Sequence, residues 1–162
     1  MAGSPEDYER VFRAEYGRLV RALTVAGGNA DAAADAVQDA FVQRHRHWGR
    51  VARYEDPAAW LRRVALHRLS NQARGRRRRD HAVTRLAPPE TMPATEPLDE
   101  DLRAAVARLA PGQRTAVALH YLADLPIADV ARAMGVSEGT VKSQLSDARA
   151  QLRRTMEVID DA

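Results

Sequence analysis

Residues 126–153 limit the possible fold more than any other stretch, because they contain two amphipathic segments around a glycine. The first segment has apolar residues at i, i+3, i+4 and i+7, which is the spacing of one helix face: Ile127, Val130, Ala131 and Met134. Gly135 follows as the residue that most easily takes the left-handed conformation at a helix end, and Ser137 suits the N-cap of a second helix. That helix, expected over residues 138–152, turns an apolar stripe inward: Val141, Leu145, Ala148 and Leu152. The pattern predicts a helix-turn-helix.

The outward face of this second helix has small side chains near its start and basic ones further along: Gly139, Lys142, Ser143, Ser146, Arg149 and Arg153. Small residues let a helix approach the wall of a DNA groove, and Lys and Arg reach phosphates or guanine edges. Duplex DNA is therefore the expected partner. A plain helical hairpin with a solvated polar face is the alternative that this segment alone leaves open.

The rest of the chain predicts an all-α protein of two small helical domains. Four of the eight prolines lie in residues 87–98, which have no apolar period and are typical of a linker. We therefore expect one domain at residues 1–86, a Pro-rich linker at 87–98 and a second, helix-turn-helix domain at 99–162. Alternating β-branched segments are absent, which leaves strands without support. Each half is close to the lower size limit for an independent core.

Positive charge is concentrated in one part of the chain. The formal net charge is only +3, yet residues 61–86 hold nine arginines and one acidic residue. A basic stretch of this kind is typical of a surface that binds a polyanion. The helix-turn-helix half is close to neutral, so we expect it to bind DNA weakly when it acts alone.

Three helices are expected in the first half, over about residues 6–25, 31–48 and 57–75. Gly27 and Gly28 end the first, and Asp56 with Pro57 begins the third. The second has an apolar stripe that extends to Trp48 and a polar face whose simplest explanation is solvation. The third buries Trp60, for which a core role is favoured over base stacking, and exposes a polar set: Arg62, Arg63, His67, Asn71 and Arg74. The arginines at 76–79 follow where this helix is expected to fray.

Several classes of function lack any support in the sequence. There is no cysteine, no apolar segment of a secretory signal and no run long enough to span a bilayer, so we expect a cytoplasmic protein without membrane insertion. No nucleophile motif or phosphate-binding glycine loop is present, and no histidine has a partner at metal-ligand spacing. We therefore expect neither an enzyme nor a cofactor or metal site.

Three motifs, in this order, resemble the extracytoplasmic-function (ECF) sigma factors, the smallest group of the sigma-70 family of bacterial RNA polymerase initiation factors. ADAAADAVQDAFVQRHRHW at 30–48 resembles their core-polymerase-binding helix. DPAAWLRRVALHRLSNQARGRRRR at 56–79 resembles the segment that recognises and melts the minus-ten element. The stretch that begins VARLAPGQR at 106 resembles their minus-thirty-five domain, with GTVKS at 139–143 as its most specific part.

The resemblance implies a promoter-specificity subunit and assigns residues to three surfaces. Minus-thirty-five DNA would meet Ser137, Gly139, Thr140, Lys142, Ser143, Ser146 and Arg149. The minus-ten strand would meet Arg53, Tyr54, Arg62, Arg63, His67, Asn71, Arg74, Arg76, Arg77 and Arg78. The core polymerase, through the clamp of its β′ subunit, would meet Asp35, Gln38, Asp39 and Phe41.

The family resemblance also implies an anti-sigma factor as a regulatory partner, besides core polymerase and promoter DNA. A free-standing helix-turn-helix regulator, in which residues 1–86 sense a ligand or dimerise, is the competing hypothesis. The two differ in what they require of the isolated chain. A sigma factor needs core polymerase to act, whereas a free-standing regulator binds duplex DNA by itself.

Overall fold

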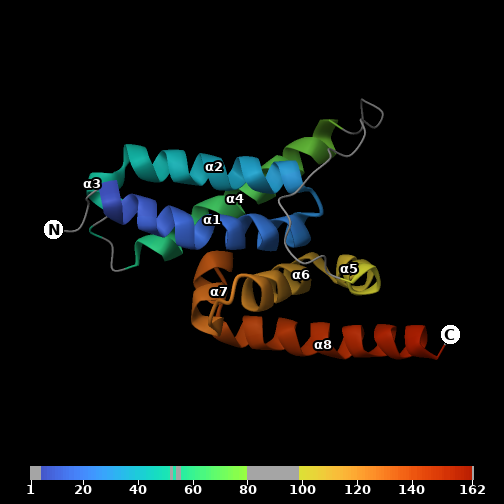
Figure 1. The fold of residues 1–162 in the computed structure, drawn as a ribbon. Helices are drawn as coiled ribbons and strands as arrows, with labels where there is room; N and C mark the ends of the chain where they lie inside the picture. The colour runs from blue at the N-terminus through green and yellow to red at the C-terminus, as the bar shows by residue number, and fades with distance from the viewer. Residues whose placement is uncertain (1–4, 52, 54–55, 80–98, 162) are drawn as a thin grey trace.

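The computed structural model describes residues 5–51, 53, 56–79 and 99–161, with the side chains of residue 5 and residues 76–79 left aside. All regular secondary structure in these ranges is helical, so the predicted all-α class is confirmed (Figure 1). The expected linker at 87–98 lies outside the described residues. Within the described ranges, no helix is both long enough and apolar enough to cross a membrane.

The N-terminal half is a bundle of α1 (Pro5–Gly27), α2 (Ala30–Arg46), the short α3 (Trp48–Val51) and α4 (Pro57–Arg79). Gly28 has φ of 72°, which lets the chain reverse within two residues between α1 and α2. The side chain of Asn29 then caps α2 by accepting a hydrogen bond from the Ala32 amide at 2.9 Å. The core between these helices contains Leu19, Leu23, Val37, Phe41, Leu61 and Leu69.

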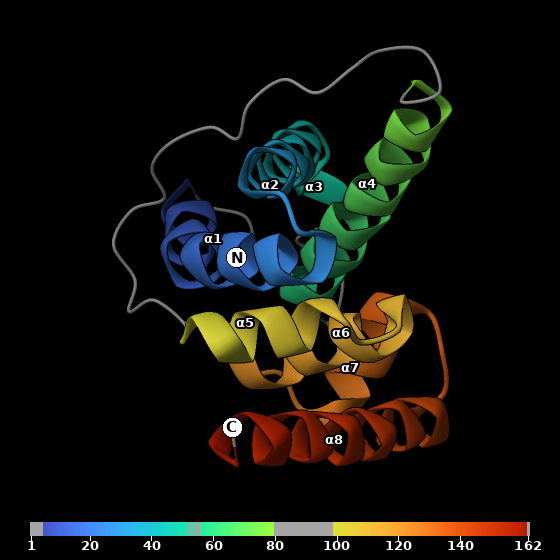
Figure 2. The ribbon, with the colours of Figure 1, turned by 90° about the vertical axis from the view of Figure 1, so that its right-hand side faces the viewer.

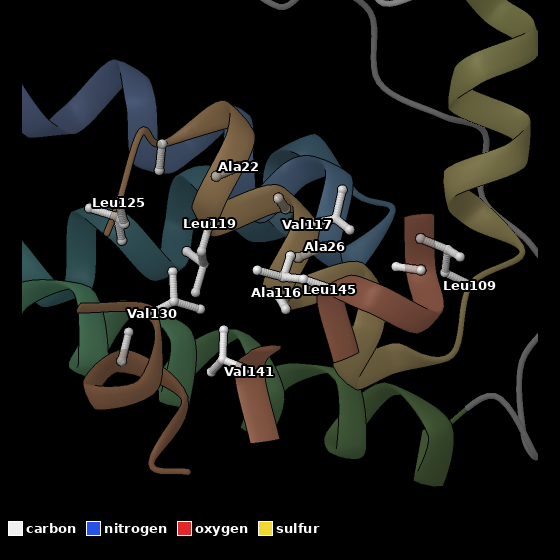
Figure 3. Close-up of a cluster of buried hydrophobic side chains, with 14 of the residues drawn as sticks. Ala22, Ala26, Leu109, Ala116, Val117, Leu119, Leu125, Val130, Val141 and Leu145 are labelled. Carbon is white, nitrogen blue, oxygen red and sulfur yellow. The ribbon is translucent and has the colours of Figure 1, made fainter. Parts of the chain in front are cut away.

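The C-terminal half contains α5 (Glu100–Ala107), α6 (Pro111–Val117), the π-helical turn η1 (Ala118–Leu122), α7 (Ile127–Met134) and α8 (Glu138–Asp160). The inward residues of α8 pack against α6, η1 and α7, as the close-up of this core shows (Figure 3). Val130, Val141 and Leu145 are essentially inaccessible to solvent. The predicted helix-turn-helix is therefore present, and its apolar stripe is the one expected from the sequence.

The ends of three helices differ from the sequence-based expectation. Helix α2 ends at Arg46 instead of about residue 48, and Trp48 begins the separate short helix α3. Helix α4 runs to Arg79 instead of about residue 75, because Gly75 costs only about 1 kcal/mol in a helix and the arginines around it are good helix formers. Helix α8 continues to Asp160.

The two halves pack against each other, which the sequence did not indicate. Figure 2 shows α1 lying over α5 and α6, with α8 forming the far layer. Ala22 and Ala26 of α1 belong to the same buried cluster as Val117 and Leu119 of the C-terminal half (Figure 3). Each half therefore covers apolar surface of the other. This adds buried area to two cores that are each small for an independent domain.

Candidate nucleic-acid interface

The turn between α7 and α8 has the geometry expected from its sequence. Gly135 has φ of 69° and ψ of 34°, the left-handed conformation. The Val136 amide donates to the Ala131 carbonyl at 3.1 Å and the Gly135 amide to the Arg132 carbonyl at 3.4 Å, which together form a Schellman C-cap. The Ser137 hydroxyl then accepts from the Thr140 amide at 3.1 Å and caps α8. Both helix ends at the turn are thus fixed locally.

The outward face of α8 is open to solvent. All seven residues expected on minus-thirty-five DNA are exposed: Ser137, Gly139, Thr140, Lys142, Ser143, Ser146 and Arg149. Three of these side chains, those of Ser137, Thr140 and Arg149, already have partners inside the protein. The Ser137 hydroxyl lies 2.9 Å from that of Thr140, so its first role is in the cap. A guanidinium nitrogen of Arg149 donates to the Tyr121 hydroxyl at 3.1 Å, which holds Arg149 against the turn η1.

A groove runs between α4, α2 and the turn that follows α7. Four exposed side chains of α4 line it: Arg63, His67, Asn71 and Arg74. Asp35 lines the opposite wall from α2, and Met134 and Gly135 close the end formed by the C-terminal half. His67 and Asn71 lie one helical turn apart, with Nδ1 of the ring 3.4 Å from the amide nitrogen. The predicted exposure of these four side chains is confirmed, and the fold gathers them on one surface.

Arg62 departs from the expectation that it is exposed beside them. Its side chain is 11% exposed and forms a bidentate pair with Glu15 of α1, at 2.7 Å and 3.1 Å. Burial by itself lowers the pKa of Arg62, but the hydrogen bond and the charge of Glu15, with Asp56 and Asp129, raise the pKa above its usual value. Arg62 is therefore a buried, fully charged structural group in this arrangement and is not free to hold a phosphate.

The expected polymerase-binding face lies on α2. Asp35, Gln38 and Asp39 are exposed there, and Asp39 makes a loose ion pair with Arg68 of α4 at 3.6 Å. Phe41 is instead 2% exposed and packs edge-on against Phe12, with ring centroids 4.8 Å apart. Its side chain supports α2 from inside the bundle and is not part of the exposed face.

Five of the expected minus-ten positions remain to be placed. Arg53 is exposed next to α3. Tyr54 lies outside the described residues, as do the side chains of Arg76, Arg77 and Arg78. Among the residues that are described, no group of His, Asp or Glu has the arrangement of a metal site.

With this geometry in place, comparison with known proteins identifies both halves. Residues 11–79 match sigma-70 region 2, and residues 99–152 match sigma-70 region 4. The ECF RNA polymerase sigma factor SigM of Mycobacterium tuberculosis is 31% identical over 162 aligned residues, covering 96% of this chain and 80% of that protein. The chain belongs to the ECF sigma factor family.

Two further relatives extend the likeness over nearly the whole sigma factor. The RNA polymerase sigma-E factor of Streptomyces antibioticus is 29% identical, covering 98% of this chain and 89% of that protein. Among solved structures, the sigma factor RpoE in complex with the anti-sigma factor NepR from Bartonella quintana aligns with a TM-score of 0.78 at 25% identity. That alignment covers 94% of this chain and 98% of the other, so it includes both halves of the molecule.

The structure of this sigma factor adds residues that the sequence analysis did not select. Tyr121 is 28 positions away from Arg149, and no local pattern signals that contact. Arg44 is fully buried in the N-terminal bundle, with its guanidinium carbon 4.4 Å from the centre of the Trp48 ring. Burial lowers the pKa of Arg44, and the nearby Tyr8 and Glu15 partly offset this. Its position three residues after Phe41 on the inward face of α2 was the available signal, but a charged side chain there is not expected.

Proposed function

We propose that this sigma factor gives core RNA polymerase its promoter choice by recognising minus-thirty-five DNA with α8 and capturing the minus-ten strand along α4. The main support is that the region 2 and region 4 matches fall on the two halves that present these separate exposed polar faces. We take residues 1–86 and 99–162 as the two functional units. The free-standing regulator is not favoured, because its sensing half would have to be the one that matches region 2.

The chemistry of α8 suits groove binding. Its first turn holds Gly139 and short hydroxyl side chains, so its backbone can come close to the bases. Lys142 and Arg149 reach phosphate or guanine edges, and Ser143 and Ser146 contact backbone or base edges. Because residues 99–162 hold eight basic and ten acidic residues and so have no excess positive charge, affinity for duplex DNA depends on attachment to polymerase.

The groove along α4 suits an unpaired strand. Arg63 and Arg74 neutralise phosphates, while His67 and Asn71 offer a ring and an amide to one unstacked base. Strand separation then draws its free energy from capture of the exposed base and backbone, without nucleotide hydrolysis and without a cofactor. We expect no catalytic step of the sigma factor's own.

Two protein partners follow from the same assignment. The exposed Asp35, Gln38 and Asp39 on α2 are proposed to dock on the clamp of the β′ subunit. An anti-sigma factor is proposed as the regulator, and the likeness to RpoE in its complex with NepR supports this class of partner.

Run-off transcription with purified core polymerase tests the function. Core plus this protein should yield defined transcripts from genomic DNA, and core alone should not. A gel shift on duplex DNA at physiological salt gives the competing result. Tight and specific binding by the isolated chain, together with transcription that never depends on it, would refute the proposal in favour of a free-standing regulator.

A charge reversal on α8 tests the assignment of its face. Lys142→Glu should lower use of promoters with an intact upstream element about tenfold, because a good contact to a base or phosphate contributes about 1–3 kcal/mol. Arg154→Glu is the matched control, since it changes the charge equally at an exposed position five residues beyond Arg149 and on a different side of α8. Equal loss in both variants would show that only overall charge matters and would remove α8 as the recognition helix.

A further inference from the structure

Tyr121 and Arg149 form a contact between η1 and α8 on the surface of the C-terminal half. A guanidinium nitrogen of Arg149 donates to the Tyr121 hydroxyl at 3.1 Å, and both residues are exposed, Tyr121 by 49%. A phenol oxygen carries one hydrogen and can accept as well as donate. The Tyr121 oxygen is the acceptor in this contact. Within the described chain its own hydrogen has no acceptor, so it is available to a ligand.

The Tyr121 ring is held in place by its own element. The Ala123 amide closes η1 by donating to the Ala118 carbonyl at 3.2 Å. The His120 ring packs edge-on against the Tyr121 ring, with ring centroids 4.8 Å apart. His120 is itself fixed, because its Nδ1 donates to the Leu125 carbonyl at 2.8 Å. The phenol is therefore positioned before any ligand arrives, which lowers the cost of binding.

Arg149 is held in position without being neutralised. Its partner Tyr121 is uncharged, and Arg149 forms no ion pair with any residue that the structure describes. The positions one turn away from it on α8 hold no acidic residue: Leu145, Ser146, Leu152 and Arg153. Arg62 is the contrast, because Glu15 neutralises that guanidinium inside the protein. Arg149 therefore offers an uncompensated charge and its remaining N–H donors to an external anion.

The position of Arg149 along α8 favours a DNA phosphate over a base edge as that anion. Recognition helices contact base edges mainly with their N-terminal residues. Arg149 follows Gly139 by ten residues, which is about 15 Å along the helix axis at 1.5 Å per residue. This length exceeds the width of the major groove, roughly 12 Å. When the first turn of α8 lies in the groove, Arg149 is therefore level with the sugar-phosphate backbone at its edge.

We propose that Tyr121 and Arg149 together bind one backbone phosphate of minus-thirty-five DNA, with the phenol both positioning the guanidinium and donating its own hydrogen to that phosphate. The proposal rests on the function proposed above and narrows it. Arg149 then contributes affinity and not base choice, because a phosphate carries no sequence information. Base recognition is left to the residues nearer the start of α8, and Tyr121 joins the DNA-binding surface as a residue of η1.

Binding of the holoenzyme to promoter duplexes tests this site. Core polymerase with this protein is titrated onto a promoter mapped by run-off transcription, and onto versions with single base-pair changes in the upstream element. Tyr121→Phe and Arg149→Gln should each weaken binding about three- to tenfold on every version. Tyr16→Phe and Arg154→Gln remove the same groups elsewhere and should bind like the wild type. A changed order of preference among the versions in Arg149→Gln, or wild-type affinity in Tyr121→Phe, would overturn the site.

Salt dependence and a double variant separate the two roles. Arg149→Gln removes a cation from the DNA and should make the slope of log affinity against log salt shallower by about one. Tyr121→Phe removes no charge, so its slope should match the wild type. The double variant should lose less affinity than the product of the two single losses, because both groups serve one phosphate. Losses that multiply independently would overturn the shared site. A wild-type holoenzyme that binds no promoter would instead refute the proposed function, and the site with it.

Discussion

The same substitution at two glycines four residues apart should have opposite effects on stability. Gly135 has φ of 69°, and an alanine there would meet no atom within 4 Å, so the cost comes from backbone conformation alone. The left-handed conformation costs about 1–2 kcal/mol for a residue with a Cβ atom. Alanine also restricts the unfolded chain, which returns about 0.4–1 kcal/mol, so the net loss of stability is about 1 kcal/mol. Gly135→Ala should lower Tm by about 2–4 °C for a chain of this length.

Gly139 lies in the first turn of α8 with ordinary helical geometry, and an added Cβ atom would be 3.8 Å from the Ser137 hydroxyl oxygen. Gly139→Ala should therefore stabilise the protein by about 0.5 kcal/mol. Urea denaturation followed by circular dichroism measures both variants under one set of conditions. If both substitutions changed the free energy of unfolding in the same direction, or if Gly135→Ala did not lower it, the conformational argument would be refuted.

Two further predictions concern the core and the cap of α8. Leu145→Ala should lower the free energy of unfolding by about 3 kcal/mol because it leaves a cavity among fully buried neighbours; Leu152→Ala, at a half-buried position, should cost clearly less, and similar values for the two would contradict the packing described. Ser137→Ala should cost about 1 kcal/mol through loss of the cap to the Thr140 amide. Ser143→Ala is the control within α8 and should be near neutral or slightly stabilising; a neutral Ser137→Ala would mean that the cap contributes nothing. Denaturant melts measure all four.

Local signals made the helix-turn-helix predictable. Gly135 and Ser137 each act through backbone atoms within five positions along the chain, so their sequence context contains the whole interaction. The exposed face of α4 was predictable for a similar reason, since helical periodicity alone places His67 and Asn71 on one side. Residue type and spacing were sufficient to predict a residue's role wherever its interaction partner lay nearby in the sequence.

Long-range partners could not be predicted in this way. Arg62 and Glu15 are 47 positions apart, and a basic residue on a polar face gives no sign that it will be buried by another helix. Arg44 occupies an inward position that periodicity did mark, but its charge argued against burial and the aromatic surface of Trp48 reversed that expectation. The packing of the two halves depends on Ala22 and Ala26, small residues that resemble ordinary positions of a helix stripe.

The packing of the two halves has a consequence for how such a chain can evolve, which depends on Arg114. Its guanidinium holds the carbonyl of Ala26 at the end of α1 and, on its other side, the carbonyl of Ala107 at the end of α5, at 3.1 Å. Both acceptors are main-chain atoms, so replacement of either alanine leaves the acceptor in place. Mutations that weaken these two hydrogen bonds therefore have to replace Arg114 itself or shift the ends of the helices that supply the carbonyls. Position 114 is therefore the one side chain whose replacement removes both hydrogen bonds at once.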